Sequence, residues 1–349
     1  MKNIFLHILG EMRYIFPTRI CRRRQVRTDR KPEFAMRSYF APMEGITTHI
    51  YRRVHARLFG GADRYYAPFI APDGSGNFRA SSARDVLPEN NTGIALVPQL
   101  LCNRAEPFLA VARQLADMGY EEVNLNLGCP SGTVVSKHKG SGTFADLSSL
   151  DDMLADIFSR APVAVSVKTR MGLESVDEFG TILEIYNKYP IAELTIHARA
   201  RSGMYKSPVD REAFLAAAQN SCAPVCYNGN IFRPEDVNLL PGTERFMLGR
   251  GAVMNPALFR ELRGGAALRR DELREFHDTL LDAYLTCGLD ARAATSRMKE
   301  LWFYMDGLFP HSGREMKVLN KSRSLEDYRA AASVIFTNCE FDSAARFNK

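Results

Sequence analysis

The sequence predicts an α/β protein, a (β/α)8 TIM barrel followed by a small C-terminal all-α helical domain. From residue 36 to residue 263, short apolar runs alternate with stretches of helical length and period. The short runs are apolar at consecutive positions, which favours strands that are buried on both faces of a parallel sheet. Eight such units within about 220 residues fit the usual length of a closed barrel.

The expected elements follow one another along the chain. We expect strands at residues 38–41, 64–68, 93–99, 122–126, 163–168, 193–197, 224–228 and 245–248. Amphipathic patterns predict helices at residues 106–119, 150–160, 175–189 and 210–220 between the strands, and at residues 269–288, 291–306 and 324–336 after them. A doubly wound open sheet is the alternative fold, but no GxGxxG motif follows the first strand.

The pattern divides the chain into three parts. Residues 1–35 hold a short apolar start and then the basic run ICRRRQVRTDRKPEF, which has no periodicity and little to bury. We expect a poorly ordered basic N-terminal extension there, either a segment upstream of the natural start or a basic arm that binds nucleic acid. Residues 36–263 form the expected barrel, and residues 264–349 the expected helical domain, where basic and aromatic residues are interleaved.

The amino-acid composition indicates which kinds of ligand and partner the protein can bind. The chain of 349 residues has a formal net charge of +6, which favours a polyanionic partner such as a nucleic acid. Its seven cysteines are scattered without a CxxC pair or clustered histidines, so we expect no metal site and a reducing, cytoplasmic location. No apolar run approaches the roughly 20 residues that cross a bilayer, so we expect no membrane partner. We also expect a monomer.

The end of the fourth expected strand carries the first candidate site. Residues 122–145 are EVNLNLGCPSGTVVSKHKGSGTFA, an apolar strand that breaks into a small, polar, glycine-rich loop. Asn126 and Cys129 stand at this strand end, where the thiol would face a ligand above the sheet and the amide could orient a planar ring. A lone cysteine is more often a small buried hydrophobe, so the other strand ends must support a catalytic role.

The carboxyl ends of the other strands converge on the same place in such a barrel. They carry Pro42, Met43 and Glu44 after the first strand, Gln99 after the third, Lys168 and Arg170 after the fifth, His197, Arg199 and Tyr205 after the sixth, Asn228, Gly229 and Asn230 after the seventh, and Gly249 and Arg250 after the eighth. Glycine turns after the last two strands are typical of a phosphate site, because bare backbone N–H groups approach an anion closely. Lys168 and Gln99 could form hydrogen bonds with the edges of a planar ring. Together with the phosphate turns, they favour flavin mononucleotide (FMN) as the ligand.

The motifs APMEGIT, VPQLLCN, VNLNLGCPS, SVKTRMG, LTIHARAR, YNGNI and MLGRGAVMNP follow one another in the chain. In this order and spacing they resemble the tRNA-dihydrouridine synthase family over about residues 38–259, and the helical tail resembles that family less specifically. The resemblance implies that the C5–C6 double bond of particular tRNA uridines is reduced by FMN, which NADPH reduces again. It also implies that the barrel binds FMN and that residues 264–349 bind tRNA.

The resemblance also implies roles for individual residues. Cys129 would donate a proton to C5 and Asn126 would contact the uracil. We expect Arg170, Arg199 and Tyr205 to contact the substrate as well. The residues implied for the flavin are Pro42, Met43, Glu44, Gln99, Lys168, His197, Asn228, Gly229, Asn230, Gly249 and Arg250. The third position of NGNI departs from the family's commoner NGD or NGE, so the role of the Asn230 side chain stays open.

Three other functions stay open at this point. A flavin barrel of the dihydroorotate dehydrogenase type would act on a free pyrimidine, but it has no use for a basic helical tail. A barrel that binds tRNA without redox activity would not need Cys129, Lys168 and the phosphate turns. A metal-dependent aldolase or isomerase would need carboxylates, which are sparse at the strand ends. The sequence also leaves the pKa of Cys129 open, because nearby cations would lower it and burial would raise it.

Overall fold

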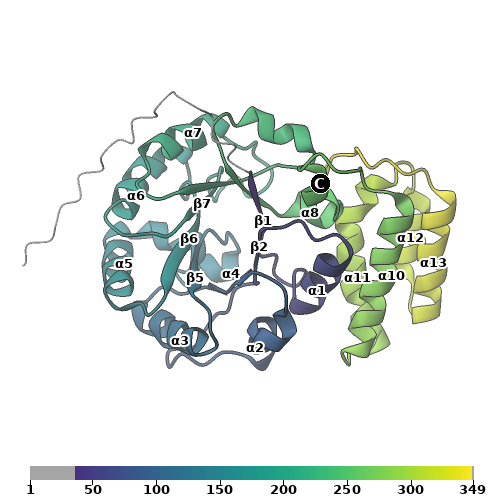
Figure 1. Cartoon of the computed structure of the whole chain (residues 1–349), viewed down its shortest axis with the longest axis horizontal. Helices are drawn as coiled ribbons and strands as arrows, with labels where there is room; N and C mark the ends of the chain where they lie inside the picture. Colours follow the sequence, from purple (N-terminus) through teal and green to yellow (C-terminus); the bar gives the residue numbers. More distant parts are fainter. Residues whose placement is uncertain (1–35, 348–349) are drawn as a thin grey trace, which may run out of the picture. The chain divides into compact units, whose positions relative to one another are not determined.

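Short parallel strands form one sheet that curls into the predicted barrel (Figure 1). The computed structural model describes residues 36–347, and our expectations for residues 1–35 lie outside the described residues. Along the sheet the order is β3-β2-β1-β9-β8-β7-β6-β5-β4. The strands are β1 (Arg37–Phe40), β2 (Arg64–Tyr66), β3 (Leu96–Val97), β4 (Gln99–Leu100), β5 (Glu122–Leu127), β6 (Ala164–Arg170), β7 (Leu194–His197), β8 (Val225–Asn228) and β9 (Arg245–Leu248).

The barrel closes through one interrupted strand. The single strand expected at residues 93–99 is present as β3 and β4, which Pro98 separates. Proline has no N–H to donate to a neighbouring strand, so the ladder breaks there. On either side of the break, β3 pairs with β2 and β4 pairs with β5, both in parallel. Residues 96–100 therefore join the two edges of the sheet.

The two faces of the sheet differ in chemistry. Side chains alternate along a strand, and on β5 the outward Val123, Leu125 and Leu127 join the main apolar core under the helices. The opposite face of the same strand carries Asn124 and Asn126, which point into the barrel. The strand is therefore buried on both faces, as expected, although polar groups that are paired with one another line the inner face of β5.

Helices cover the outside of the barrel (Figure 1). They are α1 (His49–Leu58), α2 (Ala80–Val86), α3 (Ala105–Asp117), α5 (Leu147–Arg160), α6 (Phe179–Tyr186) and α7 (Arg211–Asn220), with the shorter α4 (Gly132–Val135), α8 (Arg250–Met254) and α9 (Leu258–Glu261). Helix α5 begins earlier than predicted because Asp146 caps it, accepting a hydrogen bond from the N–H of Ser149 (3.0 Å). Short 3₁₀ turns also occur, among them η2 (Gly140–Ala145) and η4 (Pro234–Leu239).

Four helices follow the barrel, α10 (Arg270–Thr286), α11 (Ala291–Met305), α12 (Gly313–Lys321) and α13 (Leu325–Asn338). Their shared core holds Trp302, whose indole N–H donates to the hydroxyl of Tyr328 (2.9 Å). Helix α11 also reaches the barrel, since Arg297 donates to the carbonyl of Gly45 after β1 (2.9 Å). Helix α12 was not among the predicted helices. The fold is the predicted TIM barrel with an α-helical C-terminal region.

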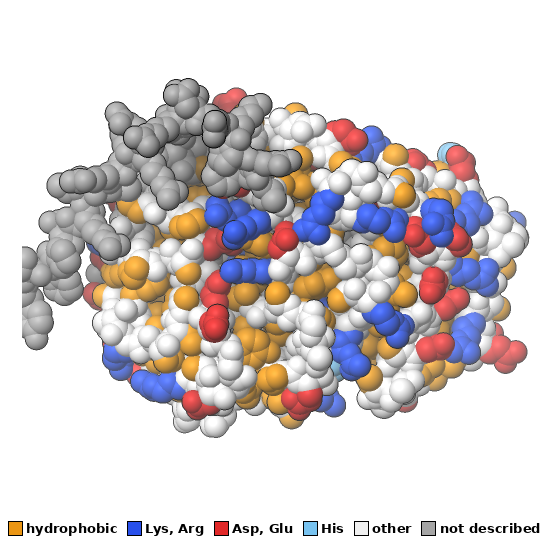
Figure 2. Space-filling view, viewed as in Figure 1, with side chains coloured by type: hydrophobic (Ala, Val, Ile, Leu, Met, Phe, Trp, Pro, Cys, Tyr) orange, Lys and Arg blue, Asp and Glu red, His pale blue; other side chains and the backbone are white. Residues whose placement is uncertain are grey.

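Lys and Arg side chains are spread over the face seen in Figure 2 and have Asp and Glu side chains among them. The visible charge on this face is therefore mixed. Within the part of the chain that the structure describes, no helix is both long and apolar enough to cross a membrane. The same residues contain no group of three or more His, Cys, Asp or Glu side chains that could hold a metal ion.

Candidate active site

Strand register places predicted site residues in two adjacent layers at the mouth of the barrel. Asn126 on β5 is the register partner of Lys168 on β6, and His197 on β7 is the partner of both Arg170 and Asn228. All of these side chains are on the inner face, at the carboxyl ends of their strands. The predicted convergence of Asn126, Lys168, His197 and Asn228 is thus present in the structure.

Asn126 holds the loop that carries Cys129. Its Oδ1 atom accepts hydrogen bonds from the backbone N–H groups of Gly128 (3.0 Å) and Cys129 (2.9 Å). On the other side of the cysteine, the hydroxyl of Ser141 donates to the Cys129 carbonyl (2.9 Å). Gly140 lies so close that an added Cβ would be 2.8 Å from the same carbonyl oxygen. The backbone of Cys129 is therefore held from both sides.

The thiol of Cys129 is protonated at neutral pH. Burial is the main cause and raises its pKa above the ordinary value. The backbone N–H of Ser131 is the strongest influence that lowers this pKa, Glu44 raises it, and the cations Lys168 and Arg170 lower it more weakly. Burial therefore prevails in the balance that the sequence left open, and Cys129 has the form of a proton donor rather than that of a nucleophilic thiolate.

A chain of side-chain hydrogen bonds links the neighbouring strands β4, β5 and β6 on the inner face of the barrel. Asn126 donates to Gln99 (2.8 Å), Gln99 donates to Asn124 (2.8 Å), and Asn124 donates to Ser166 (2.9 Å). Gln99 has no exposed surface, so in this conformation it orients Asn126 from beneath rather than lining the open mouth. Its predicted contact with a flavin stays a prediction.

Two buried arginines anchor the loops around the mouth. Arg170 donates to the carbonyls of Gly128 (3.0 Å), Ala200 (3.1 Å) and Met204 (3.1 Å), and so ties the cysteine loop to the loop after β7. Arg199 donates to the carbonyl of Ser207 (2.7 Å). Both arginines are almost fully buried. Most of their donors are thus used by the protein, and the predicted contacts of these two residues with a substrate stay predictions.

His197 is a neutral imidazole with a defined tautomer. Burial lowers its pKa well below the ordinary value, and the cations Arg170, Lys168, Arg199 and Arg250 lower it further. Its Nε2 atom lies 3.0 Å from Nη1 of Arg199, and a guanidinium can only donate. The ring proton is therefore on Nδ1, which makes His197 a hydrogen-bond donor at that atom.

The mouth has an excess of positive charge. Burial, with a smaller contribution from neighbouring Arg170, lowers the pKa of Lys168 to about 8. Burial and mutual repulsion also lower the pKa of Arg199, with Arg250 as the strongest repelling charge. No carboxylate of the described residues forms an ion pair with Lys168, Arg170, Arg199 or Arg250. Unpaired buried cations are costly, so this arrangement suits an anionic ligand.

Asn230 joins two of these cations through a neutral atom. Its Oδ1 accepts from Nη2 of Arg250 (2.8 Å) and from Nη2 of Arg199 (3.1 Å). The amide fixes the two guanidinium groups without cancelling their charge. Next to it, Asn228 donates to the carbonyl of Met247 (2.8 Å) and so fixes the end of β8 against β9.

The turns after β1, β8 and β9 complete the mouth. Met43 and Gly249 are neighbours, since a Cβ on Gly249 would lie 3.3 Å from the sulfur of Met43. Gly229 is more tightly constrained, because a Cβ there would meet the hydroxyl of Tyr227 at 2.2 Å. Glu44 is exposed and Pro42 is partly buried. A side chain at either glycine would therefore disturb the mouth.

Tyr205 is exposed and lies over the cations. The guanidinium carbon of Arg250 is 4.3 Å from the centroid of its ring, and that of Arg170 is 5.5 Å away. The ring of His197 is 5.8 Å from the same ring, centroid to centroid. Tyr205 is thus the predicted substrate residue that the structure places at the open surface of the mouth.

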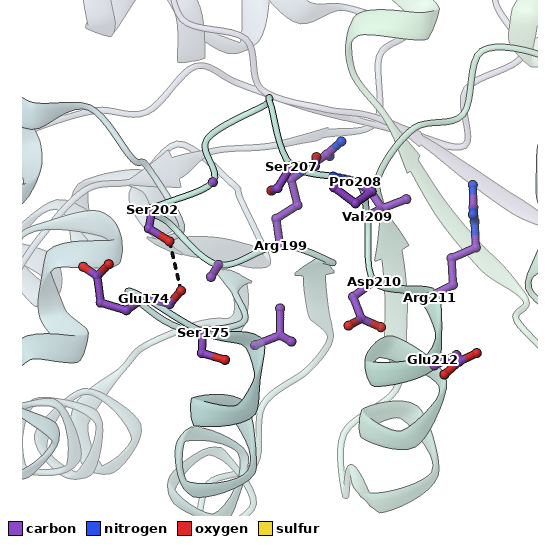
Figure 3. Close-up of a pocket in the computed structure, with 13 residues that line it drawn as sticks. Glu174, Ser175, Arg199, Ser202, Ser207, Pro208, Val209, Asp210, Arg211 and Glu212 are labelled. Carbon is purple, nitrogen blue, oxygen red and sulfur yellow. Dashed lines mark hydrogen bonds between the residues drawn. The ribbon is translucent and has the colours of Figure 1, made fainter.

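A cavity of about 510 Å³ lies beside the mouth, between the loops after β6 and β7 (Figure 3). The hydroxyl of Ser202 donates across it to the carbonyl of Glu174 (2.9 Å). Arg199 is the only predicted site residue that lines this cavity. The cavity is therefore adjacent to the convergent site and separate from Cys129, Lys168 and His197.

Sequence reasoning missed several residues that shape the site. Gly140 and Ser141 were interpreted only as part of a polar loop, although the GSG run at residues 140–142 is a signal for a close backbone contact. Phe232 and Phe347 lie against Arg250, with ring centroids 5.7 Å and 5.3 Å from its guanidinium carbon. No local pattern marks these two contacts.

Known proteins share this sequence pattern. The chain matches the family model described as Dihydrouridine synthase (Dus) over residues 39–335. It is 28% identical to a tRNA-dihydrouridine synthase B of Pseudomonas putida over 69% of this chain and 73% of that protein. It is 28% identical to a tRNA-dihydrouridine(16) synthase of Neisseria meningitidis, over 67% of this chain and 73% of that protein. The motifs, the barrel and the match across most of its length show that this chain belongs to the dihydrouridine synthase family.

Proposed function

We propose that this protein is a tRNA-dihydrouridine synthase that uses FMN and NADPH to reduce the C5–C6 double bond of uridines in tRNA. The observation that carries the proposal is a neutral, partly buried thiol at Cys129 beside a group of cations without carboxylate partners among the described residues. A proton donor and an anion-binding site within one barrel mouth are what a flavin-dependent ring reduction needs. The names of the relatives support the substrate.

The residues of the mouth fit FMN by their chemistry. Arg250 and Arg199 offer guanidinium N–H groups to a phosphate, and the backbone N–H groups of the turns at Gly229 and Gly249 would add further donors. Lys168 has no carboxylate partner in the described residues, and a ligand with electron-rich oxygen atoms would compensate its charge. His197 adds a donor at Nδ1. We assign these residues, with Pro42, Met43, Glu44, Gln99, Asn228 and Asn230, to the flavin.

The protein's part in the reaction centres on Cys129. A bound flavin that NADPH has reduced would supply a hydride for C6 of the uracil. Negative charge then develops on C5 and O4 of that ring, and the Cys129 thiol donates its proton to C5. Asn126 keeps the cysteine loop in place through Oδ1, and one of its amide hydrogens stays available for the uracil. Lys168, Arg170 and Tyr205 surround the same place and favour the developing anion.

The C-terminal helices are assigned to the tRNA. Arg314, Lys317 and Lys321 are exposed on α12 at spacings of three and four residues, so they share one face of the helix. Such a face suits a phosphate backbone, while a single uridine turned out of its stack enters the barrel mouth. We therefore keep residues 36–263 as the catalytic barrel and residues 264–349 as the tRNA-binding part of a monomeric, cytoplasmic enzyme.

One cuvette experiment tests the proposal. The purified protein should show flavin absorbance bands that bleach with NADPH and return anaerobically only when tRNA from cells lacking this enzyme is added. Bands that bleach and ignore tRNA would instead indicate a flavin reductase for a small molecule such as a free pyrimidine. A colourless protein that cannot be reconstituted with FMN would contradict the flavin assignment.

A further inference from the structure

The chain after α13 returns to the barrel mouth. We call residues 340–347 the C-terminal strap. The backbone N–H of Asp342 donates to the carbonyl of Leu308 (2.8 Å), and the guanidinium of Arg346 pairs with Asp236 (2.8 Å). The Asp236 side chain is 2% exposed and also accepts hydrogen bonds from the N–H groups of Phe232 (2.8 Å) and Arg233 (3.1 Å). The strap is thus anchored to the loop that follows β8.

The last anchor of the strap is Phe347, which is buried among aromatic rings. Its ring lies 6.1 Å from that of Phe232 and 5.6 Å from that of Tyr304, centroid to centroid, nearly parallel to both. The guanidinium carbon of Arg250 is 5.3 Å from the centroid of Phe347. A residue of the C-terminal strap therefore touches a cation of the proposed phosphate site.

Arg250 lies among three aromatic rings that come from three separate segments. Tyr205 is the nearest at 4.3 Å, from the loop after β7; Phe347 follows at 5.3 Å from the strap, and Phe232 at 5.7 Å from the loop after β8. A guanidinium in such contact keeps its in-plane N–H groups free for hydrogen bonds. Asn230 uses one of these groups, and it is the one side-chain hydrogen bond that Arg250 makes within the described residues.

We propose that the C-terminal strap completes the phosphate site of the cofactor, and that Phe347 is a positioning residue that holds Arg250 ready for the phosphate. This inference rests on the proposed function, since it takes FMN as the cofactor and Arg250 as a phosphate contact. A flexible arginine loses rotamer freedom when it binds an anion, and a side chain that is already held in place loses less. The strap follows residue 335, where the match to the family model ends.

The test compares two ligands that differ only in the phosphate. The full-length apoprotein is titrated with FMN and with riboflavin, and flavin fluorescence reports binding. Phe347→Leu keeps an apolar side chain without an aromatic face. It should weaken FMN about fivefold, as expected for one cation–π contact, and leave riboflavin within about twofold of the wild type. Phe347→Tyr restores the ring and should restore FMN affinity.

Two further variants separate this role from general packing. Arg346→Gln releases the ion pair with Asp236 and should weaken FMN in the same selective way. Phe341→Leu is the matched control. Phe341 belongs to the same strap, but its ring packs on that of Phe309, 5.5 Å away centroid to centroid, and the arginine it contacts is Arg270 rather than Arg250. It should bind both flavins as the wild type does.

The outcomes distinguish an incorrect role for the C-terminal strap from an incorrect assignment of the FMN phosphate site. If the wild type prefers FMN over riboflavin and Phe347→Leu keeps the full preference, the role of the strap is wrong while the proposed function stands. If Phe347→Leu and Phe341→Leu weaken both flavins equally, the strap acts on overall packing and the inference is again overturned. A wild type that binds riboflavin as tightly as FMN would remove the phosphate site and both proposals with it.

Discussion

Asn230 accepts a hydrogen bond from Arg250 through Oδ1, at 2.8 Å, and the same oxygen is 3.1 Å from Arg199. A neutral amide thus occupies a position between two guanidinium groups where a carboxylate would form two ion pairs. The pair of arginines keeps its full charge, and the mouth keeps its attraction for an anion.

Asn230→Asp should weaken FMN binding although it strengthens the contacts to both arginines. The added carboxylate cancels one positive charge at the phosphate site, and we expect about tenfold lower FMN affinity at low salt. Riboflavin affinity should change little, and isothermal titration of both ligands measures the difference. Equal losses for both flavins would show that Asn230 acts on the ring or on the fold rather than on the phosphate.

Cys129→Ala should leave FMN bound and reducible by NADPH while it slows tRNA reduction by about 10²–10⁴-fold, the usual contribution of a positioned proton donor. Stopped-flow absorbance separates the two half-reactions. Cys287→Ala, at an exposed position on the helical region, is the matched control and should react like the wild type. Unchanged turnover in Cys129→Ala would remove the thiol from the mechanism.

The pH dependence of the tRNA half-reaction follows from the raised pKa of Cys129. Its folded-state pKa is above the ordinary value of 9.0, and a proton donor is active only below its pKa. The rate of flavin reoxidation by tRNA should therefore stay level from pH 7 to about pH 9 and fall only above that. A fall that begins near pH 7 would mean that the thiol ionises early and that Lys168 and Arg170 prevail over burial.

Lys168→Met should stabilise the flavin-free protein and weaken FMN. Burial lowers the folded-state pKa of Lys168 to about 8 from 10.5, so the charged form is disfavoured in the fold. Below pH 8 the wild type bears the full cost, and the variant should have a free energy of unfolding about 1–3 kcal/mol higher. The gain should shrink between pH 8 and pH 10.5, as the folded lysine loses its proton while the unfolded one keeps it. Denaturant titrations at about pH 7 and about pH 10 measure this difference, and a gain that is equal at both pH values would contradict the assigned cause.

Gly140→Ala should misplace Cys129. Gly140 has a positive φ of 57°, and a Cβ there would lie 2.9 Å from the Cβ of Cys129. Small displacements of a reacting group are costly, so we expect about 10²-fold slower tRNA reduction with FMN still bound. Gly132→Ala is the control in the same loop, because a Cβ at Gly132 meets nothing within 4 Å. Similar behaviour of the two variants would show that the loop moves freely.

Local patterns are sufficient to predict the barrel and the convergence of its strand ends. Strand length, helical period and the glycine turns depend on neighbours in the sequence, and they predict that Asn126, Lys168 and His197 lie at the carboxyl ends of neighbouring strands. The break in the third expected strand has a local signal too, since Pro98 stands within an apolar run. Helix α12 was missed because it is short, with nine residues, and only Met316 and Leu319 are buried along its length.

The contacts of Phe347 and Asp236 could not be predicted in the same way. They join residues that lie about a hundred positions apart, and no spacing rule connects a C-terminal phenylalanine with an arginine after β9. The charge state of Cys129 also needed the structure, because burial and nearby cations have opposite effects and only their balance decides.

The chain of amides from Asn126 through Gln99 and Asn124 to Ser166 constrains how this barrel can evolve. Gln99 and Asn124 each donate one hydrogen bond and accept another within the chain, and Asn126 and Ser166 form its two ends. Replacing any one of the four therefore leaves a buried polar partner without its hydrogen bond. The cost of a second replacement then depends on the first, and substitutions here should show strong epistasis. Homologous barrels are therefore expected to exchange these four residues together, as one inherited block, rather than one at a time.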